Sequence, residues 1–240
     1  MSVLSSTPLR RLGALTLLLF TLLLAWDASG LDLPLARLFG TAQGFAWRDQ
    51  PTFVLLLHTL PRWFSSALLL ALFIGAVWPW GFLRALASPD RWQLALSIAL
   101  GMAAITLLKR VSSTSCPWDL AQFGGTLPHF SHWLWGVRDA GPGHCFPAGH
   151  ASAALAYLTG WCVLRRSLAP EVARRWLVAA LLAGAVLGLA QQMRGAHFMS
   201  HTLWTAWICW TLGLAIEGLR RCLPAGVARV PASLASLNKT

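Results

Sequence analysis

The chain has 240 residues, of which 56% are hydrophobic and only 11% are charged, and its formal net charge is +11. Soluble domains carry roughly 25% charged residues, so this composition excludes an ordinary soluble protein and predicts an integral membrane protein. The basic excess does not predict nucleic-acid binding, because the sequence offers no soluble basic face. We expect one all-α domain over residues 1–223 and a polar cytoplasmic tail at 224–240.

Six apolar segments follow one another along the chain, and most approach the ~20 residues that cross the hydrocarbon core of a bilayer. They are Leu12–Trp26, Trp63–Phe82, Trp92–Leu108, Ala151–Leu164, Trp176–Met193 and Thr202–Leu219. The first has an alternative interpretation as a cleaved signal peptide, since two arginines precede it and Ala28-Ser29-Gly30 follows it. The expected fold is an integral membrane six-helix bundle.

Lysine and arginine residues predict the orientation of this bundle. With the N-terminus inside, twelve of them fall on the cytoplasmic side and seven outside, as the positive-inside rule requires. The inner set includes the pairs Arg165-Arg166 and Arg220-Arg221 at the ends of predicted spans. The arginine-rich composition and the absence of eukaryotic-style targeting indicate a bacterial inner membrane, with the protein multi-pass.

The outer connection between the third and fourth spans, Lys109–Gly149, is much longer than a typical loop. Long loops are usually functional or disordered, and this one is too aromatic for disorder. Its aromatic residues are Trp118, Phe123, Phe130, Trp133 and Trp135. We therefore interpret it as a functional loop at the outer face.

Ionisable residues gather at this predicted outer face, where such groups are costly and indicate function. Lys109 ends the third span, His150 opens the fourth, and Arg194, His197 and His201 lie between the fifth and sixth. Their types suit a phosphate ester at the membrane surface. Lysine and arginine neutralise a phosphate dianion, and two histidines divide the work of attacking phosphorus and protonating the leaving alkoxide.

The start of the fourth span adds backbone donors to this set. A helix N-terminus after Gly149 presents N–H groups to an anion, and we expect Ala148 and Gly149 to bind phosphate there. No cluster of acidic residues and no cysteine spacing typical of a hydrolytic metal site is evident in the sequence. We therefore expect chemistry without a metal or another cofactor.

Three stretches in this region resemble the signature of a known family. They are Lys109 to Cys116-Pro117, then Pro147-Ala148-Gly149-His150, then Arg194 to His201. The signature belongs to the type 2 phosphatidic-acid phosphatase superfamily. Its first part is Lys, six residues and Arg-Pro, and its second is Pro-Ser-Gly-His. Its third part is Ser-Arg, five residues, His, three residues and Asp. That superfamily also contains vanadium haloperoxidases and bacterial acid phosphatases, and the resemblance extends to the six-helix plan of its membrane branch.

The resemblance implies roles for individual residues. His197 is the expected nucleophile, which forms a phosphohistidine, and His150 is the expected general acid, which then serves as base for the hydrolytic water. Lys109 and Arg194 are expected to hold the phosphoryl oxygens. The implied activity is hydrolysis of a lipid phosphomonoester or diphosphate at the periplasmic face.

The first and third motifs depart from the family pattern. Cys116 stands at an Arg position, Ala148 at a Ser position, Gln191 at an Arg position and His201 at the Asp position that orients the nucleophile. Arg110 or Arg138 are candidates for the missing cation, and His201 or Asp139 for the missing carboxylate. These departures leave open a catalytically degenerate, lipid-binding member of the same fold.

Two of the cysteines predict a link between motifs. Cys116 and Cys145 both lie on the outer side, each a residue or two before a motif proline, and an oxidising periplasm would allow them to form a disulfide. Such a bridge would tether the first motif to the second. The other three cysteines, Cys162, Cys209 and Cys222, are interpreted as reduced packing residues.

Alternatives remain at this point. Membrane histidines also ligate haem, and His197 with His201 would suit half of a zinc site. The remaining histidines are interpreted as hydrogen-bonded groups without a catalytic role: His58, His129, His132 and His144. The expected partners are membrane lipids, and the candidate substrates are a polyprenyl diphosphate such as undecaprenyl diphosphate, phosphatidic acid, phosphatidylglycerol phosphate and lipid A. Phosphotransfer between lipids and the oligomeric state are left open.

Overall fold

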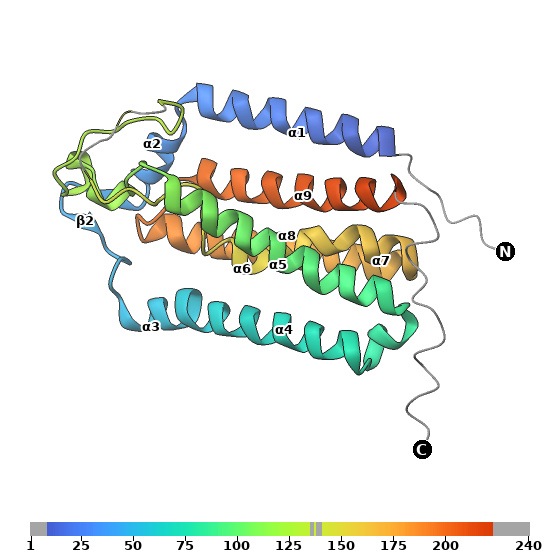
Figure 1. Ribbon diagram of the computed structural model, residues 1–240. Helices are drawn as coiled ribbons and strands as arrows, with labels where there is room; N and C mark the ends of the chain where they lie inside the picture. The colour runs from blue at the N-terminus through green and yellow to red at the C-terminus, as the bar shows by residue number, and fades with distance from the viewer. Residues whose placement is uncertain (1–8, 135–136, 138–140, 223–240) are drawn as a thin grey trace, which may run out of the picture.

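The computed structural model describes residues 9–134, 137 and 141–222, which form a bundle of long, roughly parallel helices with an elaborate loop region at one end (Figure 1). The helices are α1 (Leu9–Ser29), α2 (Asp32–Ala36), α3 (Pro51–Val54), α4 (Leu60–Val77), α5 (Ser88–Val111), α6 (Ser152–Leu155), α7 (Trp161–Ser167), α8 (Pro170–Met193) and α9 (Met199–Cys222). Strands β1 (Gly40–Thr41) and β2 (Gly44–Phe45) pair as a short antiparallel hairpin. The expectation of an all-α architecture is confirmed in its main feature, because the described chain is mostly helical.

Short segments of other helix types connect these elements. The π turn η1 (Leu55–Thr59) joins α3 to α4, and the 3₁₀ segment η5 (Ala156–Gly160) joins α6 to α7. Three further 3₁₀ turns are η2 (Gly81–Ala85), η3 (Pro117–Asp119) and η4 (Ala121–Phe123). The segment from 112 to 151, between α5 and α6, contains η3 and η4.

Within the described residues, four helical segments are long and apolar enough to cross a membrane: Arg10–Ser29, Pro51–Ala85, Ser88–Val111 and Pro170–Met193. They contain the first, second, third and fifth predicted spans, and they indicate a membrane protein. The second begins at Pro51, twelve residues before the predicted start, because the helix continues through Pro61. The fourth and sixth predicted spans correspond to α6–η5–α7 and α9, so six crossings stay a prediction.

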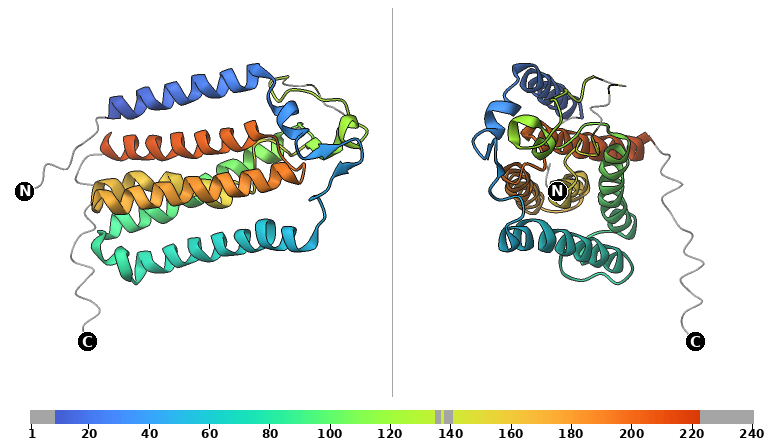
Figure 2. Two further views of the ribbon diagram at one scale, coloured as in Figure 1. Left: turned by 180° about the vertical axis from the view of Figure 1, so that it is seen from behind. Right: turned by 90° about the vertical axis from the view of Figure 1, so that its left-hand side faces the viewer.

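The helix formed by α6, η5 and α7 is the centre of the bundle. In the end-on view of Figure 2 it lies between α8 and α5. Its residues Ala151, Ala156, Val163 and Leu164 are fully buried, whereas α1, α4, α5 and α8 all expose large apolar side chains. Close packing against α9 depends on Gly213, since a Cβ there would lie 2.7 Å from the Thr159 Cα atom. The central helix therefore positions whatever lies at its N-terminus with little freedom.

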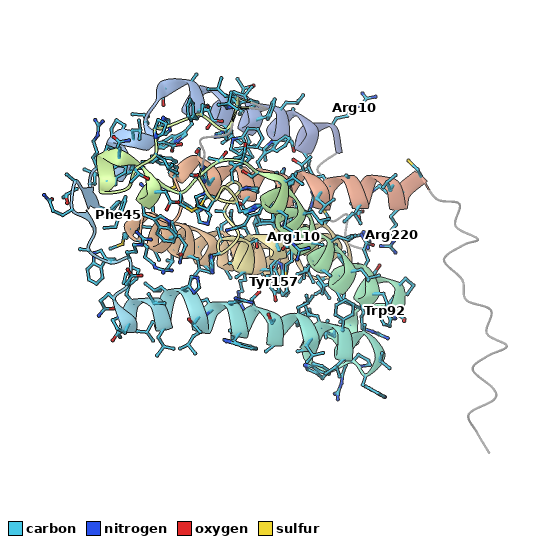
Figure 3. The ribbon with its side chains drawn as sticks, turned by 60° about the vertical axis from the view of Figure 1, so that its left-hand side comes forward. Arg10, Phe45, Trp92, Arg110, Tyr157 and Arg220 are labelled. Carbon is cyan, nitrogen blue, oxygen red and sulfur yellow. A yellow bond between two sulfur atoms is a disulfide. The ribbon has the colours of Figure 1, made fainter. Side chains whose placement is uncertain are left out.

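Charged residues tie three helices together at the end of the bundle opposite the loops. Arg166 of α7 pairs with Glu217 of α9 and, at 2.9 Å, with Asp90 of α5. Arg220 pairs with Asp90 at 2.7 Å, and Arg221 pairs with Glu217 at 3.0 Å. Figure 3 shows Arg10, Trp92 and Arg220 toward this end and Phe45 toward the other. Those predicted cytoplasmic basic residues that the structure describes and the figure labels thus lie toward one end.

The opposite end is covered by α2, the β1–β2 hairpin and residues 112–151. A small core of Ala36, Phe45, Leu120, Phe123 and Phe198 holds these segments together. Asp32 of α2 caps α9, because its carboxylate accepts the Ser200 N–H at 3.0 Å and the Ser200 hydroxyl. Packing from three parts of the chain therefore fixes the turn between α8 and α9.

Candidate active site

The turn between α8 and α9 presents His197 in a defined orientation. Helix α8 ends in a Schellman motif, in which Gly195 N–H donates to the Gln192 carbonyl and Ala196 N–H to the Gln191 carbonyl, both at 2.9 Å. Gly195 adopts φ +73°, and a Cβ there would lie 2.3 Å from the Phe45 ring. Glycine is therefore required at this position, both for its left-handed backbone and for the close approach.

His197 is almost entirely buried, with 2% of its surface exposed. Its Nδ1–H donates to the Cys145 carbonyl oxygen at 2.7 Å. This bond leaves the lone pair on Nε2, the atom that a nucleophilic imidazole uses. Burial lowers the pKa of His197 well below its ordinary value, and the charge of Lys109 lowers it further. The ring is thus neutral and holds its lone pair available at neutral pH.

A disulfide between Cys116 and Cys145 fixes the carbonyl that receives this bond. Their Cα atoms are 5.2 Å apart, so the segment after α5 is joined to the segment before α6. The backbone around the bridge is paired as well, because Cys145 N–H donates to the Thr114 carbonyl at 2.9 Å. The structure therefore pairs the two cysteines that the sequence suggested as partners.

Arg194 is held by hydrogen bonds that leave part of its guanidinium available. Nε donates to the Arg48 carbonyl at 2.9 Å, and Nη1 donates to the Gln191 side-chain carbonyl at 3.1 Å. Gln191 is itself fixed, since its amide donates to the Leu57 carbonyl at 3.3 Å. Nη2 has no hydrogen-bond partner among the residues that the structure describes, so it can donate to an anion.

Lys109 and Gly149 lie directly against one another. A Cβ at Gly149 would meet the Lys109 Cδ atom at 3.2 Å and the ammonium nitrogen at 3.5 Å. The absence of a side chain at Gly149 therefore lets the Lys109 ammonium reach the backbone at the start of the central helix. This arrangement combines a cation with helix N–H groups, as a phosphate site requires.

His150 follows Gly149 and stacks on a residue from a distant part of the chain. Its ring centroid lies 3.7 Å from that of His58 in η1, with 31° between the ring planes. The pKa of His150 is lowered to about 3 by burial and then by the charges of His58, Lys109, Arg194 and Arg62. His150 is therefore neutral at neutral pH and surrounded by positive charge.

The sequence profile of the PAP2 superfamily matches residues 90–220. The chain belongs to the PAP2 superfamily. This membership supports a phosphatase activity, and the matched region carries all three predicted motifs. His58 lies outside it.

The fold agrees with this assignment. The structure is similar to the crystal structure of a transmembrane PAP2-type phosphatidylglycerolphosphate phosphatase from Bacillus subtilis, with a TM-score of 0.55 and 16% identity. The alignment covers 88% of this chain and 98% of that one. A search of the curated proteins finds no significant match.

The departures from the PAP2 signature have structural explanations in this chain. Cys116 cannot supply a cation, and its disulfide instead fixes the Cys145 carbonyl beside His197. His201 is fully buried, and its Nδ1 lies 3.5 Å from His197 Nδ1. The Cys145 carbonyl makes the shorter contact, so it takes the orienting position that the sequence assigned to His201 or Asp139.

The expected phosphate donors Ala148 and Arg110 need correction. Ala148 N–H donates to the His201 carbonyl at 3.1 Å, so it is already paired and does not face the site as a free donor. Arg110 is exposed and lies about 100° around α5 from Lys109, on another face of the helix. Arg138 and Asp139 lie outside the described residues.

The other histidines occupy several environments. His144 donates to the Lys109 carbonyl at 3.1 Å, and His129 packs edge-on against Phe198. His132 pairs with Asp27 at 3.3 Å and stacks on Phe146. For these three, the interpretation as hydrogen-bonded or packed groups stays in place. His58 is different, since sequence reasoning missed its contact with His150.

His197 and His201 have the side-chain type that commonly binds metal ions. Within residues 9–134, 137 and 141–222, no group of three or more histidine, cysteine, aspartate or glutamate side chains is arranged to hold a metal ion. His197 and His201 lie side by side, with ring centroids 5.7 Å apart. The charge of Lys109 acts on both rings, which suits an anion.

Proposed function

We propose that this PAP2 protein is a lipid phosphatase that acts through a phosphohistidine on His197, without a metal ion. The observation that carries the proposal is the buried hydrogen bond from His197 Nδ1–H to the Cys145 carbonyl. It fixes the tautomer in which Nε2 is the proposed nucleophile, on a ring that also feels the positive charge of Lys109. Nucleophile, proton donor and phosphate cations then come from the three motifs that define the family.

The proposed reaction has two steps. His197 Nε2 attacks phosphorus, the bond from phosphorus to the lipid oxygen breaks, and His150 gives its proton to the leaving oxygen. Water then attacks the phosphohistidine while His150 takes a proton from it, which releases phosphate and restores both rings. Lys109 and Arg194 stabilise the negative charge that develops on the phosphoryl oxygens.

On this proposal, His150 takes up its proton when the substrate binds. The pKa of His150 is lowered to about 3 because burial and nearby cations disfavour its charged form. A bound phosphate group adds negative charge beside Lys109 and Arg194, which offsets their effect and favours protonated His150. We infer that substrate binding is coupled to proton uptake at neutral pH.

An apolar cavity supports a lipid as the substrate. It has a volume of about 690 Å³ and lies between α4, α8 and the central helix. Leu57 and Leu60 line one side, Ala153 and Tyr157 the central helix, and Ala183 the α8 side. Because Leu57 precedes His58 directly and Ala153 lies three residues after His150, the cavity begins near the proposed general acid. A hydrocarbon chain in this cavity would place its ester oxygen at His150.

The location of the site supports activity at the outer face of a bacterial inner membrane. The basic residues predicted to be cytoplasmic gather at the end of the bundle away from His150 and His197. By the positive-inside rule, the histidine end then faces the periplasm, where a disulfide is stable. A phosphate headgroup at that surface is within reach of the site without crossing the bilayer.

The experiment is a panel of lipid phosphates and diphosphates offered to the purified protein in detergent and chelator. We expect phosphate release from at least one of them, and its loss in His197→Ala. His129→Ala is the matched histidine control and should retain activity. Absence of turnover with every lipid, together with retained lipid binding, would instead establish a catalytically degenerate member of the fold.

A second measurement separates the two histidines. With p-nitrophenyl phosphate, the leaving group needs no proton, so His150→Ala should still form the phosphoenzyme but hydrolyse it slowly. Trapped protein should carry an acid-labile, alkali-stable phosphate on the peptide that contains His197. A phosphate on any other residue would contradict the proposed mechanism.

A further inference from the structure

His58 reaches the site from a part of the chain that the PAP2 profile does not match. It lies in η1, the π turn within the continuous helix from Pro51 to Val77. Turns of this type inside α-helices occur frequently at functional sites, because the extra residue shifts which side chains face a neighbour. The stacking on His150 connects this turn to the second motif.

Pro61 explains how the turn is connected to the rest of the site. Proline has no N–H, so it cannot donate to the Leu57 carbonyl four residues earlier. That carbonyl accepts a hydrogen bond from the Gln191 amide instead, at 3.3 Å. Gln191 also holds Arg194, at 3.1 Å. The backbone beside His58 is therefore hydrogen-bonded to the residue that orients a phosphate-binding arginine.

The contact between the two imidazoles is unusually close. Aromatic pairs generally have centroids 4.5–7 Å apart, whereas His58 and His150 are 3.7 Å apart. The Nδ1 atom of His58 is buried and has no hydrogen-bond partner among the described residues. A buried polar atom without a partner is costly, so packing alone is a poor account of this histidine.

The charges that face this pair come from every neighbouring element. Lys109 comes from α5, Arg62 from α4 and Arg194 from the end of α8, and all three act electrostatically on both His58 and His150. His197 is the other titratable ring near His150. Two positive imidazoles stacked among three cations would repel strongly, so at most one of the two rings can be in its protonated, cationic form at a time.

The position of the pair also matches the bond that breaks. Leu56, Leu57 and Leu60 surround His58 in the chain and line the apolar cavity, as do Ala153 and Ala154 after His150. The pair therefore stands where the phosphate site meets the cavity. On the proposed function, this is the place of the oxygen that links phosphate to lipid.

We propose that His58 is a positioning residue for His150: it holds the His150 ring at the leaving oxygen and competes with it for protonation when the substrate binds. The proposal rests on the proposed lipid phosphatase activity. It assigns a role to the N-terminal part of the chain, which contributes no residue to the family signature.

The test compares His58→Phe, His58→Ala and wild type in the pH dependence of kcat. Phenylalanine keeps a ring against His150 but cannot take a proton. Removing the competing imidazole raises the pKa of His150, so activity should persist to higher pH, with the basic limb shifted by about one unit. The maximal kcat of His58→Phe should stay near wild type, whereas His58→Ala should lose on the order of ten-fold.

Leu55→Phe is the matched control, because Leu55 lies in the same π turn, is 49% exposed and does not line the cavity. It should leave the rate and the profile unchanged. A basic limb that is identical in wild type and His58→Phe would overturn the proposal, as would full activity of His58→Ala. If His58→Phe does not fold, His58→Gln is measured instead. The same shift is expected, because the glutamine side chain also does not become positively charged.

A readout that does not depend on turnover distinguishes this inference from the proposed function. In protein saturated with inorganic phosphate, the His150 ring is followed by ¹⁵N NMR as the pH is raised. If the cationic His150 ring loses its proton at a higher pH in His58→Phe than in wild type, the result supports competition between the two rings. Equal titration in both proteins refutes that competition. Failure of all lipid substrates would refute the lipid phosphatase proposal alone.

Discussion

The Nδ1 atom of His197 lies 2.7 Å from the carbonyl oxygen of Cys145. A backbone carbonyl thus makes the contact that fixes the tautomer of the proposed nucleophile, while the residue at the signature's Asp position, His201, is 3.5 Å away. A carbonyl carries no formal charge, so it favours the protonated imidazole less than a carboxylate would, and burial and Lys109 outweigh its effect. The low pKa of His197 agrees with this difference.

The disulfide should therefore affect catalysis as well as stability. In Cys116→Ser the Cys145 carbonyl is no longer tied to the first motif, and we expect kcat to fall about ten-fold while KM changes little, as befits lost orientation. The stability should decrease by about 3 kcal/mol, measured by denaturant or thermal unfolding in detergent. Cys222→Ser is the control, because Cys222 is an exposed free cysteine at the end of α9. A normal kcat with reduced stability would show that the bridge only stabilises the fold.

Replacing His201 with aspartate should restore the family's carboxylate next to the nucleophile. A negative charge beside His197 favours its protonated form and raises its pKa, so the nucleophile becomes protonated at a higher pH than in wild type. The acidic limb of the pH profile of kcat/KM should accordingly move to higher pH. His201→Asn has a similar size without the charge and should leave the limb in place. Equal shifts in both variants would contradict the electrostatic explanation.

The sequence was sufficient to predict the helical architecture and the motif residues at the site. Lys109, Gly149, His150, Arg194 and His197 follow from local patterns, because residue type and spacing carry the chemistry. The exceptions depend on contacts between distant segments. The Cys145 carbonyl leaves no signal in residue type, since every residue has one.

His58 and the second helix illustrate a different obstacle. Proline usually marks a helix boundary, and the predicted span from Trp63 began after Pro61, so it left His58 outside. The helix passes through Pro61 because η1 rearranges the backbone hydrogen bonds. The Gln191 amide then donates to the Leu57 carbonyl, which Pro61 cannot do. A histidine three residues before a proline in an apolar run was the available signal. The central position of α6–η5–α7 was also hidden, since a buried helix and a lipid-facing one are both apolar.

The charge network at the far end of the bundle should matter for stability but not for chemistry. Glu217 is 2% exposed and pairs with Arg166 and Arg221. In Glu217→Gln, Arg166 keeps Asp90 and the Gln93 side chain but loses one of its two ion pairs, and we expect a loss on the order of 3 kcal/mol. Thermal unfolding measures the loss, and kcat per folded molecule should be unchanged. A fall in kcat without a change in stability would link this end of the bundle to the site.

Narrowing the apolar cavity should separate lipid recognition from phosphate chemistry. Ala183 lines the cavity from α8 and is not among the residues proposed to contact phosphate. In Ala183→Trp a large side chain competes with the hydrocarbon chain, so KM should rise by about ten-fold for a long-chain lipid phosphate, equivalent to the contact of roughly two methylene groups. With p-nitrophenyl phosphate, which has no such chain, kcat/KM should stay within about two-fold of wild type because only uniform binding is lost. Leu182→Trp on the exposed side of α8 is the control for bulk alone. An equal loss for both substrates would mean that the variant disturbs the site itself, and no loss for either would exclude the cavity as the place of the lipid chain.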